Sequence, residues 1–103
     1  MGYKIPGMRA ELVVHEKFVL EDNAIVEIKA WQVPKSAEHP EEYKYSMVYI
    51  DPQHRRAIGY DNSKRQDHHR HYYGVQTPSK FESIDELMRR FLNEVRQLRG
   101  ELQ

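Results

Sequence analysis

Alternation of side chains along residues 43–50 constrains the fold more than any other feature of this sequence. Three tyrosines and a methionine occupy every second position of the segment, with other side chains between them. Successive side chains of a β-strand point to opposite faces of a sheet, so this period of two predicts a strand with one apolar face. Aromatic and β-branched residues are also enriched in strands. We therefore predict that residues 43–50 form a half-buried strand.

Other segments show extended patterns, and short polar turns separate them. The turn signals are Glu21-Asp22-Asn23, Asp51-Pro52-Gln53 and Asp61-Asn62-Ser63, and residues 35–42 form a polar loop. Gly74 marks a bulge or a bend. The predicted strands are residues 9–15, 18–20, 24–33, 43–50, 55–60 and 69–75.

The sequence predicts one helix, over residues 83–99. Ser83 followed by Glu86 forms a capping box, which satisfies two backbone amides at the start of a helix. Gly100 is suited to the position just after the helix end. The apolar residues at helical spacing form one stripe: Ile84, Leu87, Met88, Phe91, Leu92, Val95 and Leu98.

This order of elements predicts an α+β fold. Sequential strands joined by short turns form an antiparallel β-meander, here of five or six strands, and the C-terminal helix covers one face. The length of 103 residues suits a single domain. We expect a loose arm over residues 1–8, the sheet over 9–75 and the helix over 83–99. The other face of the sheet is then at least partly open to water and offers a ligand surface.

Composition excludes several classes of protein. The chain contains no cysteine, which excludes disulfide scaffolds, thiolate catalysis and cysteine–zinc sites. Uninterrupted apolar runs are only a few residues long, so we expect neither a membrane span nor a signal peptide, and we expect a cytoplasmic protein. An antiparallel meander also leaves an open edge strand, through which two copies could pair.

Positive charge is concentrated in the centre of the chain. The chain is neutral overall, but residues 54–74 contain 5 basic and 2 acidic residues and four of the six histidines. Such a stretch creates a local field that attracts anions. Tyr60, Tyr72 and Tyr73 alternate with these cations, and aromatic and guanidinium groups together bind single-stranded nucleic acid.

Two histidines in this stretch suggest acid–base chemistry. If residues 69–73 are extended, His69 and His71 lie on one face, with Arg70 and Tyr72 on the other. A histidine pair can act as base and acid in one reaction, and a nearby cation can stabilise developing negative charge. That set suits metal-free cleavage of RNA. Two alternatives stay open: a metal site completed by Asp61, Asp67 or His54, and a polar rim in which these side chains only satisfy one another.

Several short motifs, in order along the chain, carry a resemblance to a known family. These are Arg9-Ala10-Glu11-Leu12, the stretch 20–27, Trp31 and Pro34, Tyr43-Lys44-Tyr45, Tyr60-Asp61-Asn62, His69-Arg70-His71, Gly74, and residues 81–87 with Phe91. With them the chain resembles TumE-type toxins of type II toxin–antitoxin pairs. The chain departs from the family pattern in its centre, where Asp67-His68-His69-Arg70-His71 contains an additional histidine and the turn before it lacks glycines.

The resemblance implies a toxin that a cognate antitoxin protein holds inactive and that acts on RNA. Combined with the residue chemistry, it leads us to expect a metal-independent endoribonuclease without a cofactor. We expect His69, His71 and Arg70 to be catalytic, and the substrate-binding residues to be Tyr60, Asn62, Lys64, Arg65 and Tyr72. A non-catalytic module that binds nucleic acid or protein is the alternative, and a metal-dependent hydrolase is a third.

Overall fold

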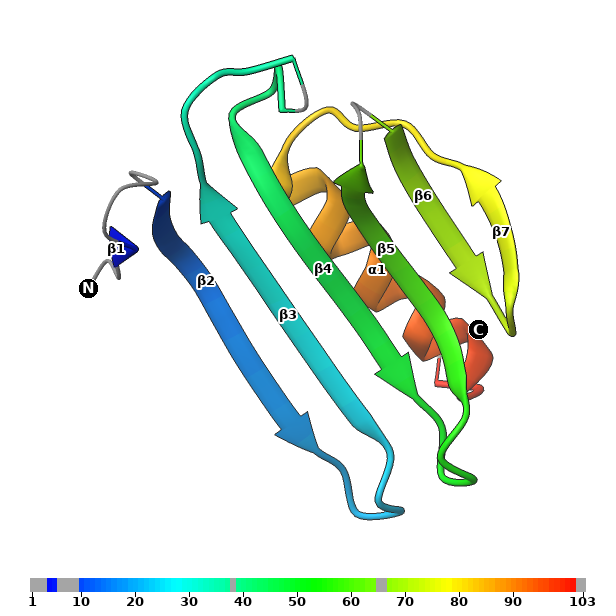
Figure 1. Cartoon of the computed structure of the whole chain (residues 1–103). Coiled ribbons are helices and arrows are strands. Elements are labelled where there is room, and N and C mark those ends of the chain that lie inside the picture. Colours follow the sequence, from blue (N-terminus) through cyan, green and yellow to red (C-terminus); the bar gives the residue numbers. More distant parts are fainter. Residues whose placement is uncertain (1–3, 6–9, 38, 65–66, 102–103) are drawn as a thin grey trace.

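The structure, a computed structural model, describes residues 4–5, 10–37, 39–64 and 67–101. They form one sheet and one helix (Figure 1). The elements are β1 (Lys4–Ile5), β2 (Ala10–Val19), β3 (Ile25–Gln32), β4 (Tyr43–Ile50), β5 (Arg56–Lys64), β6 (Asp67–Tyr72), β7 (Val75–Pro78) and α1 (Ile84–Leu98).

The sheet is an antiparallel meander, and the helix covers one of its faces. The strands follow one another in space in the order of the sequence, from β1 to β7, and every neighbouring pair is antiparallel. Helix α1 packs against β4 and β5, and Figure 1 shows it behind the sheet. This confirms the predicted α+β class, with β1 adding a two-residue strand at one edge.

The core lies between α1 and the face of the sheet that it covers. Val26 and Ile28 of β3 and Met47 of β4 point into it, as period two requires. From the helix, the predicted stripe supplies the fully buried Leu87 and Phe91. Burial of these apolar side chains is the main free-energy term that holds the helix on the sheet.

Both ends of the helix are capped, but only the Ser83 half of the predicted capping box forms, because the Glu86 carboxylate pairs with Arg90. The side chain of Ser83 accepts a hydrogen bond of 3.1 Å from the backbone N–H of Glu86. At the other end Gly100 has a φ of 74°, a left-handed conformation that glycine adopts without strain. The backbone N–H of Glu101 then donates to the carbonyl of Arg96, so the last turn is closed by a Schellman motif.

The first predicted strand differs from the structure. Residues 10–19 form one strand, β2, rather than a strand over 9–15 and a separate arm over 18–20. The register shifts between Leu12, which pairs with Trp31, and Val14, which pairs with Ala30. A bulge of this kind changes the face on which apolar residues fall, so the alternation breaks although the strand continues.

The last predicted strand is two strands joined by a tight turn. Tyr73 and Gly74, with φ values of 46° and 84°, connect β6 to β7. Two consecutive residues with positive φ are what a two-residue hairpin turn needs, and a tyrosine rarely occupies the first of them. Gly74 therefore belongs to a hairpin turn, and the prediction of one strand over 69–75 was wrong.

Strand β5 also extends further than predicted. It continues to Lys64 through Asp61-Asn62-Ser63, where the sequence pattern predicts a break. Asn62 is fully buried there and bonds to the neighbouring strand, so its side chain supports the sheet instead of a turn. Of the arm expected over residues 1–8, Lys4–Ile5 pairs with β2, and the rest lies outside the described residues.

None of the described helices is sufficiently long and apolar to span a membrane.

Candidate functional site

The histidine pair lies on the face of the sheet that the helix leaves open. Strand β6 sends His69 and His71 to this face and sends His68, Arg70 and Tyr72 towards α1, as the alternation predicts. The two imidazole ring centroids are 6.4 Å apart. Both side chains are partly exposed, so a dissolved molecule can reach them.

His71 is held by a carboxylate on the neighbouring strand. Its Nε2 lies 2.9 Å from Oδ2 of Asp61 on β5. An ionised carboxylate can only accept a hydrogen bond, so Nε2 carries the proton and Nδ1 keeps its lone pair when the ring is neutral. A carboxylate in this position fixes the tautomer of the ring and stabilises the imidazolium that forms when Nδ1 takes a proton.

Arg56 supplies a cation to the same place. Its Nη2 lies 3.5 Å from Oδ2 of Asp61, and nearly half of the Arg56 side chain is exposed. Arg56 reaches this position because it lies across Gly59, the residue that pairs with His71. A Cβ added at Gly59 would come within 2.6 Å of Arg56 Nη2, so only glycine leaves room for the guanidinium.

His69 has a neutral partner instead. Its Nδ1 lies 3.0 Å from Nε2 of Gln76, which faces it from β7. The two rings of the pair therefore have different surroundings: His71 contacts a carboxylate that also pairs with a guanidinium, and His69 contacts an amide. This difference separates the two imidazoles chemically. We call His69, His71, Asp61 and Arg56 the open-face site.

Arg70 lies on the other face, against the helix. Its guanidinium donates two hydrogen bonds, of 3.0 and 2.6 Å, to Oε2 of Glu94 on α1. Tyr60 donates its hydroxyl to the same carboxylate. Burial, together with this bond to Glu94, raises the pKa of the Tyr60 hydroxyl to about 12. Tyr60, Arg70 and Glu94 form what we call the helix-side cluster.

Asn62 is bound inside the protein. Its Oδ1 accepts a hydrogen bond of 2.9 Å from the backbone N–H of Tyr45, and its Nδ2 donates to the carbonyl of Tyr43 and to Glu41. Its amide is therefore occupied by β4 and by the loop before it. The structure does not bring Tyr60, Asn62 or Arg70 together with the histidine pair.

The remaining predicted binding residues lie around the β5–β6–β7 corner. The Tyr72 ring is partly exposed on the helix side, with the Arg70 guanidinium 5.1 Å from its centroid. Lys64 ends β5 and pairs through its backbone with Asp67, and its side chain is outside the described part. Arg65 lies outside the described residues altogether.

The structure gives no ligand set for a metal ion. In the part of the chain that it describes, no three side chains of His, Asp or Glu are grouped closely enough to hold one. Asp61, which the sequence analysis considered as a ligand, contacts His71 and Arg56 instead.

Sequence reasoning did not include Arg56, Gly59 and Gln76 in the site. Gly59 lies opposite His71 in the pairing of β5 with β6. A prediction of that register would have placed Gly59 and Asp61 on the face that carries the histidines. Arg56 could not have been found in this way, because a register shift separates it from the rest of β5: Ile58 pairs with Tyr49, but Arg56 pairs with Ile50.

Comparison with known families gives a match that extends over most of the chain. The family model described as Toxin TumE matches residues 7–99, a range that includes the open-face site and the whole of α1. The chain belongs to the TumE toxin family. The resemblance noted in the sequence is thereby confirmed. No curated protein matches the chain, and no solved structure does.

Two of the motifs that carry the resemblance to TumE toxins lie in the part of the sheet that holds the open-face site. The motifs Tyr60-Asp61-Asn62 and His69-Arg70-His71 lie side by side on β5 and β6, where Asp61 pairs with His69 and Tyr60 pairs with Arg70. Each motif contributes to both faces. One of its polar side chains points to the open-face site and another to the helix-side cluster.

Proposed function

We propose that this TumE-family chain is the toxin of a toxin–antitoxin pair and that it cleaves RNA at the open-face site without a metal ion. One observation supports the reaction above all: two partly exposed imidazoles lie on one face, with ring centroids 6.4 Å apart, beside a guanidinium. A hydrogen bond reaches about 3 Å, so one small group between the rings can contact both of them. Membership of a toxin family supports the biological setting.

The reaction needs a base, an acid and a cation. The base removes the proton from a ribose 2′-hydroxyl, and that oxygen forms a bond to the adjacent phosphorus. The bond from phosphorus to the 5′-oxygen breaks, and the acid protonates this oxygen as it leaves. The products are a 2′,3′-cyclic phosphate and a free 5′-hydroxyl. The cation stabilises the extra negative charge of the pentacoordinate phosphorane.

The surroundings of the two imidazole rings suggest which ring is the base and which is the acid. Asp61 leaves Nδ1 of His71 as a proton acceptor and stabilises the resulting imidazolium, which suits the base. His69, whose ring contacts the amide of Gln76, then serves as the acid, and Arg56 stabilises the phosphorane. The contacts of Lys64, which ends β5, and of Arg65, which lies outside the described residues, with RNA phosphates stay predictions.

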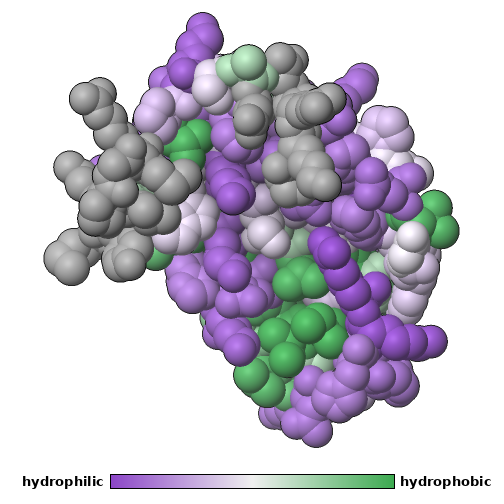
Figure 2. All heavy atoms as spheres, viewed as in Figure 1, coloured by the Kyte–Doolittle hydropathy of each residue, from purple (hydrophilic) through white to green (hydrophobic). Residues whose placement is uncertain are grey.

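The open face offers a path for the RNA beyond the site. Figure 2 shows this face as mostly hydrophilic, with an apolar patch in its lower part. At the ends of β2, β3 and β4 the register places Val19, Ile25 and Ile50 next to one another. Two rows away from that end, on the same face, Lys29 pairs with Ser46, Ser46 pairs with Asp61, and Asp61 pairs with His69. Strands are about 4.8 Å apart, so this row runs about 14 Å from His69 to Lys29 and accommodates a short single strand.

The decisive experiment separates the base from the acid. His71→Ala and His69→Ala are each assayed on an RNA oligonucleotide and on uridine 3′-(p-nitrophenyl phosphate), whose leaving group departs without protonation. We expect both variants to lose at least about 100-fold of RNA cleavage. On the aryl ester, His69→Ala recovers most of its activity and His71→Ala does not. The matched control is His15→Ala, because His15 also lies on the open face and pairs with a carboxylate, Glu27.

Two outcomes would overturn the reaction. Unchanged RNA cleavage in His71→Ala would place the chemistry elsewhere. If the wild-type chain binds RNA but never cleaves it, the chain is instead a binding module.

A further inference from the structure

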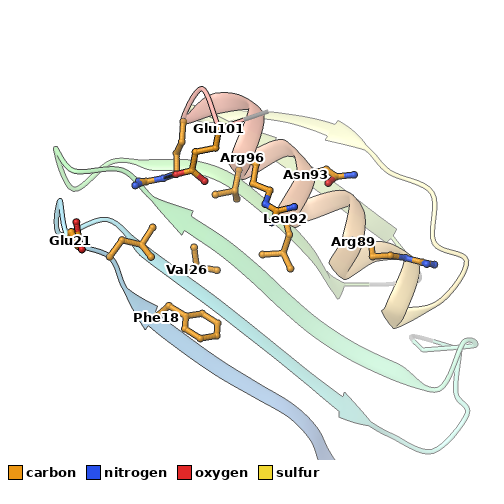
Figure 3. A pocket seen from close by; sticks show the side chains of 11 residues that line it. Phe18, Glu21, Val26, Arg89, Leu92, Asn93, Arg96 and Glu101 are labelled. Atoms are coloured by element: carbon orange, nitrogen blue, oxygen red, sulfur yellow. Dashed lines mark hydrogen bonds and ion pairs between the residues drawn. The ribbon is translucent and has the colours of Figure 1, made fainter. Parts of the chain in front are cut away.

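Helix α1 is narrower than the sheet it covers, and this leaves a groove beside it. The helix packs against β4 and β5, so the same face of β2 and part of β3 lie uncovered. A groove of about 720 Å³ runs there between sheet and helix. Figure 3 shows Phe18 of β2 and Leu92 of α1 reaching into it from opposite sides.

The groove is apolar, and its large side chains are exposed. Phe18 is 48% exposed and Leu92 is 37% exposed, although both point to the side of the sheet that carries the core. Leu20, Val26 and Val95 complete the apolar lining. A contiguous apolar surface of this kind, rimmed by charges, is typical of a site where a protein partner docks.

The dimensions of the groove suit a helix. Packed helices lie about 8–10 Å apart, and neighbouring strands about 4.8 Å apart. A helix placed one position away from α1, which covers β4 and β5, therefore lies over β2 and β3. Such a helix completes the second layer of a two-layer domain.

Charged residues along the edge of α1 indicate which side chains the docked helix carries. Arg89 and Arg96 are two turns apart on α1, line the groove and are exposed. Their side chains form no hydrogen bond or ion pair with any residue that the structure describes, whereas Arg90 pairs with Glu86 and Arg99 pairs with Asp22. Two unpaired guanidinium groups at the rim of an apolar groove attract carboxylates.

We propose that the groove receives an amphipathic helix of the antitoxin, with its apolar stripe on Phe18 and Leu92 and carboxylates opposite Arg89 and Arg96. The proposal rests on the assignment of the chain as the toxin of a pair, and it does not depend on RNA chemistry. The groove and the histidine pair lie on opposite faces of the sheet. The helix therefore docks without touching His69 or His71.

The test measures binding of the full-length chain to the purified product of the adjacent gene. We expect Leu92→Asp to weaken the complex at least 100-fold, because it places a charge in the apolar groove. Val75→Asp is the matched control, since Val75 is 63% exposed on β7, outside the groove lining, and it should leave the affinity unchanged. Circular dichroism checks that both variants fold.

A charge exchange tests the rim. Arg89→Glu combined with Arg96→Glu should weaken binding about 10-fold or more at low salt, and replacing the partner's opposing carboxylates by lysine should restore it. Unchanged affinity in Leu92→Asp would overturn the proposal. So would a wild-type dimer that Leu92→Asp converts to monomers, because a second copy of the chain would then be the occupant.

The two proposals fail separately. His71→Ala should abolish RNA cleavage and leave partner binding intact, and Leu92→Asp should do the reverse. A chain that binds its partner through the groove yet cleaves no RNA would refute the nuclease reaction alone.

Discussion

The open-face site and the helix-side cluster are built from alternate residues of the same two strands, yet their surroundings differ. On the open face, His71 and Asp61 are partly exposed, and Arg56 is nearly half exposed. On the other face, Arg70 donates twice to Glu94, and the fully buried Tyr60 donates to the same carboxylate. Exposure alone does not separate the two sets, because Arg70 and Glu94 are 31% and 23% exposed and His71 and Asp61 are 18% and 16% exposed. The difference is that the helix supplies a carboxylate to Tyr60 and Arg70, whereas the open-face groups lie on a face that the helix leaves uncovered.

The comparison teaches that position on a face decides what a polar residue contributes. Buried polar groups lose water and must find internal hydrogen bonds, so they contribute mainly to stability. Polar groups on a face that no helix covers can exchange partners with a bound molecule, so they are available for chemistry. Substitutions on the helix side should therefore affect unfolding, and substitutions on the open face should affect cleavage.

The largest effect is expected on the helix side, at Asn62. Asn62→Ala removes the bonds to the backbone N–H of Tyr45 and the carbonyl of Tyr43, and leaves both without that partner. We expect the free energy of unfolding to fall by about 3 kcal/mol. Urea denaturation measures it. Asn93→Ala, at an exposed position of α1, is the control and should change stability little. Equal stability of the two variants would show that Asn62 has no structural role.

The next effect is expected on the open face, at Arg56. Arg56→Ala removes the guanidinium beside Asp61 and should reduce RNA cleavage about 100-fold, which corresponds to about 2.7 kcal/mol in the barrier. Its stability should stay close to that of the wild type. Arg55→Ala is the control, because Arg55 pairs with Asp51 away from the site. A greater loss of cleavage in Arg70→Ala than in Arg56→Ala would show that the helix side, and not the open face, carries the reaction.

A smaller effect distinguishes position from charge. Gly59→Ala keeps every charged group but places a methyl where the Arg56 guanidinium lies. We expect cleavage to fall about 10-fold, since Arg56 must move. Stability should be equal or slightly higher, because alanine is favoured over glycine within a strand by about 0.5–1 kcal/mol. Cleavage and thermal unfolding are measured on the same sample. Full activity would show that the placement of Arg56 across Gly59 is unimportant.

The smallest effect is a change in alkaline stability. The pKa of Tyr60 is about 12 in the folded chain, against about 10 for an unperturbed tyrosine. The unfolded chain loses this proton first, so the contribution is complete below pH 10 and is lost as the pH rises towards 12. At pH 11 we expect this group to have lowered the free energy of unfolding by about 1 kcal/mol relative to pH 8. Denaturation at pH 8 and pH 11 should show that Tyr60→Phe loses less stability between the two pH values than the wild type does. An identical loss of stability would contradict a raised pKa of Tyr60.

Most of the fold was predictable because its signals are local. The alternation in residues 43–50 corresponds to β4 residue for residue, and the capping box and the apolar stripe locate α1. The errors occur where a local signal is ambiguous. Asn62 resembles a turn residue until a neighbouring strand provides partners for its amide, and Tyr73 gives no hint of a positive φ.

The candidate site was predictable only in part. Alternation placed His69 and His71 on one face and Arg70 on the other, and the structure agrees. Of the neighbours of the pair, Asp61 was expected only as a possible metal ligand, and Gln76 and Arg56 were not expected, because they come from other strands. Asp61 and Gln76 reach the histidines through the register between strands, and Arg56 reaches them through a register shift between Arg56 and Ile58.

The sequence by itself determined the class of the fold, the two faces of each strand and the membership of the TumE family. Period two, period 3.6 and capping are properties of a single segment, so they can be read from the chain alone. Only the tertiary structure decided that Arg56 accompanies the histidines, that Arg70 binds Glu94 and that a groove remains beside α1. These features depend on which strands pair and on how far one helix extends over a wider sheet, and no single segment encodes either.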